Sequence, residues 1–167
     1  MYVRKEYSLL KKRLEEPRHL IQVLMGPRQI GKSTVVKQVL KDLPIPHLLY
    51  AADDVPTSQK KWISDCWAQA RLMVKAQGLS ELVLVIDEIQ KLVGWSETVK
   101  KEWDADTYND VPIKVLLLGT SRALLERGLA DSMAGRYEEI RMSHWSFPEM
   151  HDAFGWSFEQ YVFYGGY

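Results

Sequence analysis

The chain has 167 residues, 46% of them hydrophobic and 26% charged, which is the size and composition of one globular domain with its own core. Lysine plus arginine and aspartate plus glutamate number 22 each, so no net field attracts nucleic acid or an anionic membrane, although a local patch could still contact nucleic acid. The single cysteine, Cys66, excludes an internal disulfide and indicates a reducing compartment. Residues 1–6 lack the apolar segment of a signal peptide, and no apolar run approaches the length of a membrane span, so we predict a cytoplasmic protein without membrane contact.

The first half of the chain alternates between helical and strand patterns. In chain order, the predicted elements are a helix over residues 4–16, a strand over 20–25, a helix over 33–40, a strand over 47–52 and a helix from Thr57 or Ser58 to about Gln77. Pro17 ends the first helix, and Gly78 ends the last one. Thr57 or Ser58 is the expected N-cap, because a short hydroxyl side chain accepts hydrogen bonds from the first free N–H groups of a helix.

The second half continues the alternation. Its predicted elements are a strand over residues 82–86, a polar helix over about 95–106, a strand over 113–118, a short helix over 122–128 and a more exposed strand over 137–142. The runs 82–86 and 113–118 are apolar without alternation, which is typical of strands buried on both faces, as in parallel sheets. We therefore predict an α/β fold, a three-layer αβα sandwich with a mostly parallel central sheet of about five strands.

Residues 26–33 read Gly-Pro-Arg-Gln-Ile-Gly-Lys-Ser, a complete phosphate-binding loop of the form G-x-x-x-x-G-K-S. In this pattern backbone N–H groups converge on a triphosphate, the lysine reaches its β and γ phosphates, and the serine hydroxyl takes a place on magnesium. The pattern requires a strand before it and a helix after it, and both are predicted here. A glycine turn with a stray lysine is the alternative, and the flanking elements argue against it. The residues expected to hold a nucleoside triphosphate are Gly26, Pro27, Arg28, Gln29, Ile30, Gly31, Lys32, Ser33 and Thr34.

A pair of acidic residues, Asp87 and Glu88, ends the predicted strand over 82–86. Such residues lie at the carboxyl edge of a parallel sheet, where ligands bind in open α/β folds. We expect Asp87 to support magnesium together with Ser33, and Glu88 to polarise a water near the γ-phosphate. By itself such a pair is usually a solvated strand end, and it is the phosphate loop upstream that favours the functional interpretation.

Two further features bring polar groups to this region. Gly119-Thr120-Ser121 ends the strand over 113–118. If that strand lies between the loop strand and the acidic strand, a hydroxyl of Thr120 or Ser121 would orient water or sense the γ-phosphate; the alternative is a helix N-cap. Arg136 precedes the last strand, and from a neighbouring subunit its charge would stabilise the transition state at the γ-phosphate. The alternative for Arg136 is a surface arginine or a local ion pair.

Several segments together make the chain resemble the AAA+ ATPases. They are the phosphate loop at 26–33, Leu-Val-Ile-Asp-Glu-Ile-Gln at 84–90, Leu-Gly-Thr-Ser at 118–121 and Met-Ala-Gly-Arg-Tyr at 133–137. With Ser-Phe-Pro-Glu-Met at 146–150 and the aromatic end at 163–167, the chain is similar to a bacterial and archaeal group in which this domain precedes a C-terminal region of unknown function.

The resemblance implies a five-stranded core with the phosphate-loop strand in its centre. It also implies roles for single residues: nucleotide binding by the loop including Lys32, magnesium at Asp87, water at Glu88, the sensor position at Thr120 or Ser121, and the arginine finger at Arg136. By the same resemblance, residues 1–145 would form the ATPase core with its N-terminal helix, and residues 146–167 would begin a truncated C-terminal helical region.

The function expected is therefore an ATPase that takes ATP and Mg²⁺ and couples hydrolysis to a conformational change in a larger protein. Its partners would be ATP or ADP and, through a shared nucleotide site, further copies of the chain. One alternative is a nucleotide-gated switch or interaction module with little turnover. Another is a phosphate-loop kinase, which would have to exclude the water that Glu88 is suited to activate.

Overall fold

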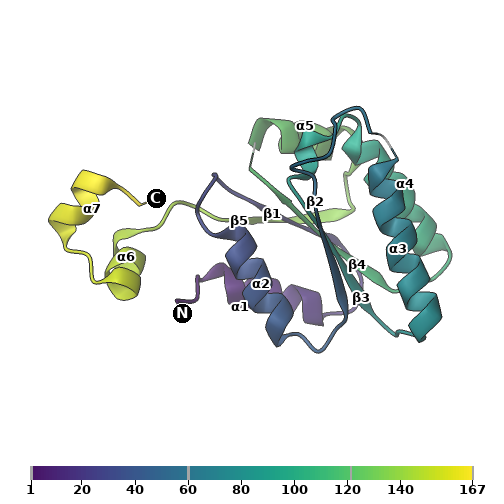
Figure 1. Ribbon diagram of the computed structural model, residues 1–167, viewed down its shortest axis with the longest axis horizontal. Helices are drawn as coiled ribbons and strands as arrows, with labels where there is room; N and C mark the ends of the chain where they lie inside the picture. The colour runs from purple at the N-terminus through teal and green to yellow at the C-terminus, as the bar shows by residue number, and fades with distance from the viewer. Residues whose placement is uncertain (1, 60, 121, 167) are drawn as a thin grey trace.

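The computed structural model describes residues 2–59, 61–120 and 122–166. Its elements are α1 (Glu6–Glu15), β1 (Ile21–Met25), α2 (Lys32–Asp42), β2 (His47–Ala51), α3 (Trp62–Gln77), β3 (Leu82–Asp87), the 3-10 helix η1 (Ile89–Lys91), α4 (Trp95–Tyr108), β4 (Ile113–Gly119), α5 (Arg122–Ser132), β5 (Tyr137–Arg141), α6 (Phe147–Phe154) and α7 (Phe158–Tyr164). Figure 1 shows their arrangement around one twisted sheet.

The sheet has five strands in the order β2-β3-β4-β1-β5, and every neighbouring pair is parallel. The predicted α/β fold is thereby confirmed, with a sheet that is parallel throughout. Because the strands are parallel, the carboxyl ends of β1, β4 and β3 lie side by side at one edge. β4 lies between the other two, which is the strand order that the predicted role of Thr120 or Ser121 at the γ-phosphate assumes.

Helices cover both faces of the sheet (Figure 1), and each face has its own apolar core. Alternate residues of one strand enter different cores: Val83 and Val85 pack with α1 and α2, whereas Leu84 packs with α3, α4 and α5. Such alternation, with both sets apolar, is what a strand between two helical layers needs. The edge strands β2 and β5 are partly exposed.

The predicted N-cap of the third helix is wrong. α3 begins at Trp62, and no side chain caps it. Thr57 and Ser58 lie in a turn between β2 and α3, where the Thr57 carbonyl accepts a hydrogen bond from the N–H of Val93 at 3.4 Å. Hydroxyl residues favour turns as well as caps, so their presence alone could not place the start of the helix.

The helix predicted over 122–128 is longer than expected, since α5 continues to Ser132. Gly128 does not end it. A Cβ at this position would lie 2.6 Å from Cζ2 of Trp95, so glycine here permits the close approach of α5 to the start of α4.

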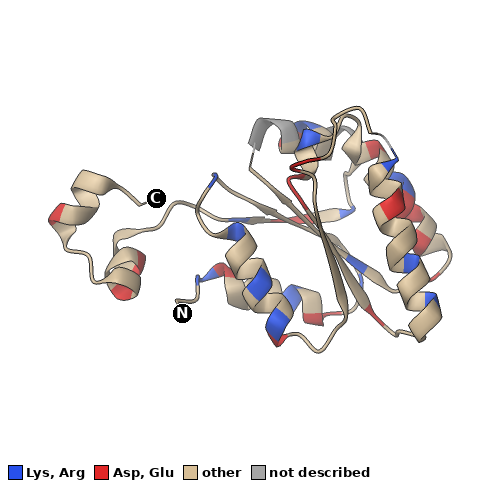
Figure 2. Ribbon diagram, viewed as in Figure 1, with Lys and Arg blue, Asp and Glu red and all other residues tan. Residues whose placement is uncertain are grey.

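The last two helices, α6 and α7, stand apart from the sheet in Figure 1. They pack on each other through aromatic rings, with Phe147 edge-on to Phe158 at a centroid distance of 5.4 Å. They carry acidic side chains but no lysine or arginine (Figure 2). The buried Arg4 joins them to the core, because its Nε lies 2.9 Å from Glu149 and its Nη1 donates to the carbonyl of Ile30. In the described ranges, no helix has both the length and the apolar character needed to cross a membrane.

Candidate functional site

The predicted phosphate loop connects β1 to α2 at the carboxyl edge of the sheet. Ile30 is 1% exposed, so its side chain anchors the loop in the core and only its backbone is available to a ligand. Gln29 and Gly31 have positive φ angles, 63° and 93°, and these left-handed residues turn the chain into the helix. Gly26 has no room for a Cβ, which would collide with the carbonyl oxygen of Met142.

The N-terminus of α2 is suited to bind an anion. Gly31 stands at the N-cap position, no side chain caps the helix, and the first turn contains no acidic residue. The first N–H groups of the helix, together with the positive end of its dipole, are therefore available to a negatively charged group.

Lys32 lies at the start of this helix and is 6% exposed. Its Nζ donates to the carbonyl oxygens of Gly26, at 2.8 Å, and Pro27, at 2.5 Å. The pKa of Lys32 is lowered by burial, and the nearby carboxylates of Glu88 and Asp87 offset only part of that shift. The ammonium group is thus held by neutral carbonyls, which phosphate oxygens could replace.

The acidic pair at the end of β3 faces the loop. The Ser33 hydroxyl donates to Oδ2 of Asp87 at 2.9 Å, so the two residues predicted to hold magnesium are in contact. Glu88 adopts a left-handed conformation with φ 54°, which costs about 1–3 kcal/mol for a residue other than glycine. Its Oε2 accepts hydrogen bonds from Thr120 Oγ1 at 2.9 Å and from Gln90 Nε2 at 2.6 Å.

Residues of the loop, Glu88 and Thr120 line an open hollow of about 650 Å³. Its lining consists of Arg28, Gln29, Gly31, Lys32, Ser33, Thr34, Asp53, Glu88, Lys91 and Thr120. The volume is within the range of small-molecule sites, and the chemistry fits a triphosphate with a divalent cation: N–H donors and an ammonium for phosphate oxygens, a hydroxyl and a carboxylate for the cation.

The ion pair between Lys91 and Asp53 at this hollow was not predicted. Asp53 follows β2, so its place at a strand end was the available signal. Lys91 belongs to η1, whose position follows from the turn at Glu88 and could not be read from the pattern.

A second hollow, of about 390 Å³, adjoins the first at Gly31 and Thr34. It is mainly apolar, and its other lining residues are Tyr2, Arg4, Val35, Gln38, Trp145, Ala153 and Phe154. Aromatic and aliphatic walls next to a phosphate site suit a flat heterocyclic base. This hollow could not be predicted from the sequence, because its aromatic residues Tyr2, Trp145 and Phe154 come from the two ends of the chain and meet α2 only in the fold.

Of the remaining predicted residues, one lies outside the described part of the chain and one is not brought to the loop of its own chain. Ser121 lies outside the described residues. Arg136 is at the amino end of β5, where its carbonyl accepts a hydrogen bond from the N–H of Ile21, so it lies at the edge of the sheet opposite the loop of its own chain. Its guanidinium forms a bidentate pair with Asp104 of α4, at 2.8 and 2.9 Å.

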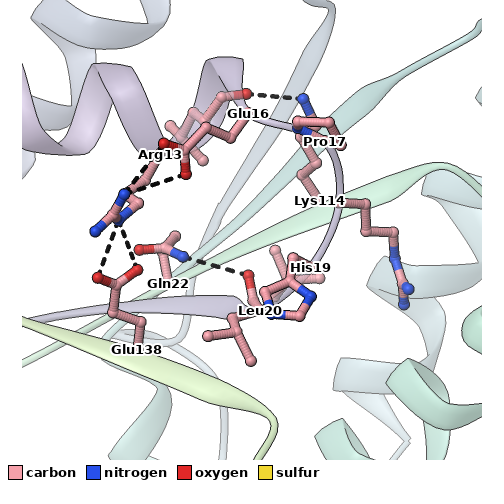
Figure 3. A pocket seen from close by; sticks show the side chains of 11 residues that line it. Arg13, Glu16, Pro17, His19, Leu20, Gln22, Lys114 and Glu138 are labelled. Atoms are coloured by element: carbon pink, nitrogen blue, oxygen red, sulfur yellow. Dashed lines mark hydrogen bonds and ion pairs between the residues drawn. The ribbon is translucent and has the colours of Figure 1, made fainter.

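The amino edge of the sheet has its own hollow, of about 280 Å³, shown in Figure 3. Here Arg13 pairs with Glu138 at 2.8 Å and with Glu16 at 3.1 Å. The buried Lys114 donates to the Leu14 carbonyl at 2.9 Å and pairs with Glu81 at 2.7 Å. The charged side chains of this hollow are satisfied within the chain, by these ion pairs and, for Arg18, by hydrogen bonds to the carbonyls of Ile113 and Trp103, so we assign it no ligand.

Comparison with known proteins gives two results. A protein-family model described as "AAA domain" matches residues 18–151, a range that contains the loop, Asp87, Glu88, Thr120 and Arg136. An uncharacterized protein of Haemophilus influenzae is 26% identical to the chain over 139 residues, which cover 77% of this chain and 32% of the relative. The chain thus spans about a third of the length of that relative.

Proposed function

This chain belongs to the AAA domain family, and from this membership and the geometry of the site we propose that it binds ATP with Mg²⁺ and hydrolyses it. The observation that carries the proposal is the convergence of three strand ends on one hollow. They bring together an uncapped helix N-terminus, the ammonium of Lys32 and the carboxylate of Glu88.

The start of α2, Lys32, Ser33, Asp87 and Glu88 have separate roles in this reaction. The N–H groups at the start of α2 bind phosphate oxygens, and Lys32 exchanges its two carbonyl partners for them. When bound, magnesium neutralises charge on the phosphates, and Ser33 and Asp87 would hold it. Glu88 accepts the proton of the attacking water as the water oxygen bonds to the γ-phosphorus and the bond from that phosphorus to the ADP oxygen breaks.

The apolar hollow beside the loop would take the base of the nucleotide. Tyr2, Trp145 and Phe154 line it, and it meets the phosphate hollow at Gly31 and Thr34. One continuous ligand could therefore place its base on one side of the helix start and its γ-phosphate on the other.

Hydrolysis would act on a larger assembly. Arg136 points away from the loop of its own chain, so as a finger it would serve the nucleotide of a neighbouring copy. Residues 1–145 would form the ATPase core. Residues 146–167 would begin a C-terminal region that Arg4 couples to the loop through Ile30 and Glu149, and motion of this region would transmit the nucleotide state.

A second candidate function is a nucleotide-gated switch with little turnover. The pairing of Arg136 with Asp104 favours it, because a chain whose finger is engaged in its own ion pair would hold ATP without assembling a complete site.

The test is steady-state ATP turnover by the wild-type chain, Glu88→Gln and the control Glu138→Gln. Glu138 is a half-buried glutamate at the other edge of the sheet. We expect Glu88→Gln to retain ATP affinity and lose at least about 100-fold in kcat, because the general base is removed while the binding groups stay. Glu138→Gln should retain turnover. ATP binding without any Glu88-dependent hydrolysis would leave the switch as the function.

A further inference from the structure

Gln90 is a buried polar residue beside the site that neither the motif nor the proposed reaction uses. It lies in η1, two residues after Glu88, and is 7% exposed. The left-handed turn at Glu88 folds the chain back, so that the Gln90 amide reaches the Glu88 carboxylate.

Gln90, Thr120 and Glu88 form a closed triangle of hydrogen bonds. Gln90 Nε2 donates to Glu88 Oε2 at 2.6 Å and to Thr120 Oγ1 at 3.2 Å. The Thr120 hydroxyl donates in turn to the same Oε2 at 2.9 Å. Two donors thus converge on one carboxylate oxygen, while Oε1 has no donor among the described residues.

The other end of the Gln90 amide is left unsatisfied. Its Oε1 is buried and has no hydrogen-bond partner within the part of the chain that the structure describes. Rotating the amide would place two acceptor oxygens 2.6 Å apart, so the observed orientation is fixed. Gly119 makes room for this oxygen, since a Cβ there would lie 2.6 Å from it. A buried acceptor without a partner destabilises a fold, and an apolar side chain of the same size would avoid that cost.

We propose that Gln90 is the positioning residue for Glu88. It holds Oε2 so that Oε1 is the atom that takes the proton of water, and it ties the carboxylate to Thr120 at the end of β4. The inference rests on the proposed ATP hydrolysis. It explains why a polar side chain with an unsatisfied oxygen occupies a buried position where methionine or leucine would be more stable.

The test compares two buried glutamines of the same sheet. Gln22 in β1 is 5% exposed and also has a buried Oε1 without a partner in the described part of the chain, but it lies at the hollow of Figure 3, away from the loop. Gln90→Met and Gln22→Met both remove an unsatisfied oxygen at nearly constant volume. Neither should lower the melting temperature.

We expect Gln90→Met to lower kcat about 10- to 100-fold with KM for ATP unchanged, and Gln22→Met to leave both at the wild-type values. Thr120→Val should lower kcat similarly. The double variant Gln90→Met/Thr120→Val should be far less impaired than the product of the two single effects, because both residues act on one oxygen.

Three outcomes would overturn the inference. If Gln90→Met lowers the melting temperature but not kcat, the amide has a structural role. If the effects of Gln90→Met and Thr120→Val multiply, the two residues do not act through a shared carboxylate oxygen. If the wild-type chain itself shows no ATP turnover, both the proposed function and this inference are wrong. If the wild-type chain turns over ATP but Gln90→Met does not lower kcat, only this inference is wrong.

Discussion

The two edges of the sheet both carry charged side chains, but they satisfy them differently. At the amino edge opposite charges pair with each other: Arg13 with Glu138, Lys114 with Glu81, and Arg136 with Asp104. At the carboxyl edge Lys91 pairs with Asp53, whereas Lys32, Asp87 and Glu88 are held by carbonyl, hydroxyl or amide groups. Among the described residues none of these three has an ion pair within 4.0 Å.

Whether a charged side chain pairs with an opposite charge or with neutral groups separates charges that stabilise the fold from charges that are available to a ligand. An ion pair within the chain is already neutralised, and a ligand would have to break it. A lysine bound to carbonyls and a carboxylate bound to a hydroxyl keep their charge available for phosphate or a cation. Both edges have hollows, so neither the presence of a cavity nor the number of charges identifies the site.

The largest expected effect contrasts Lys32→Met with Lys114→Met. Both lysines are buried, at 6% and 5% exposure. Lys32→Met should weaken ATP binding roughly 100-fold, since charged hydrogen bonds to phosphate are lost. It should destabilise the fold less than Lys114→Met, because the Lys32 hydrogen bonds to the Gly26 and Pro27 carbonyls are only part-buried, so that water can replace the ammonium. Burial also lowers the pKa of Lys32 and so disfavours its charge.

Lys114→Met should do the reverse. It leaves the Leu14 carbonyl without its donor and Glu81 without its partner, a loss of about 2 kcal/mol of stability, or roughly 4–8 °C in melting temperature for a chain of this size. ATP affinity should stay at the wild-type value. Equal loss of ATP binding in both variants would mean that the edges are not functionally distinct. Isothermal titration and thermal melts measure the two quantities.

The second comparison concerns Arg136, the one amino-edge charge for which we propose a catalytic role. If Arg136 serves a neighbouring copy, ATP turnover per chain should rise with protein concentration, and Arg136→Ala should abolish that rise. At the highest protein concentration the turnover of Arg136→Ala should be at least about tenfold below that of the wild type. Asp104→Asn frees Arg136 and should keep the rise. Turnover that is independent of concentration and insensitive to Arg136→Ala would assign the arginine to its ion pair alone.

Residue positions that follow from a local sequence pattern could be predicted. The loop residues, Asp87, Glu88 and Thr120 all lie at ends of apolar runs, and parallel strands bring those ends together without further information. The motif identifies the residues of the site, and the strand order determines which of them lie next to one another.

Residue positions that depend on a backbone turn or on contacts between distant segments could not be predicted from the sequence. Gln90 reaches Glu88 only because a glutamate adopts a left-handed conformation, which residue type does not favour. Tyr2 and Trp145 meet because α1 and the segment after β5 lie beside the same loop. Thr57 was misread because hydroxyl residues serve turns and caps alike.

The smallest effect is a pH dependence at the Asp104–Arg136 pair. The hydrogen bond from Arg136 lowers the pKa of Asp104 below its usual value of 3.8. A carboxylate with a lowered pKa in the folded state contributes stability above pH 3.8 and loses it as the pH falls through the folded pKa. The Asp104 side chain is 45% exposed, so solvent screens the pair and its contribution at pH 7 should be below about 1 kcal/mol.

Melting temperatures of the wild type and Asp104→Asn should therefore differ by no more than about 2–4 °C at pH 7, and the difference should shrink as the pH falls below 3.8 toward the folded pKa of Asp104. A difference that does not change with pH would show that Asp104 stabilises the fold by contacts other than the charge of Arg136. A small, pH-dependent difference has a consequence for the proposed finger. A pair worth less than about 1 kcal/mol can be exchanged for charge-assisted hydrogen bonds to a phosphate, which are worth more, whenever a second subunit presents one. The weak pair with Asp104 would then keep the Arg136 guanidinium in place until it binds a phosphate at the carboxyl edge of a neighbouring subunit.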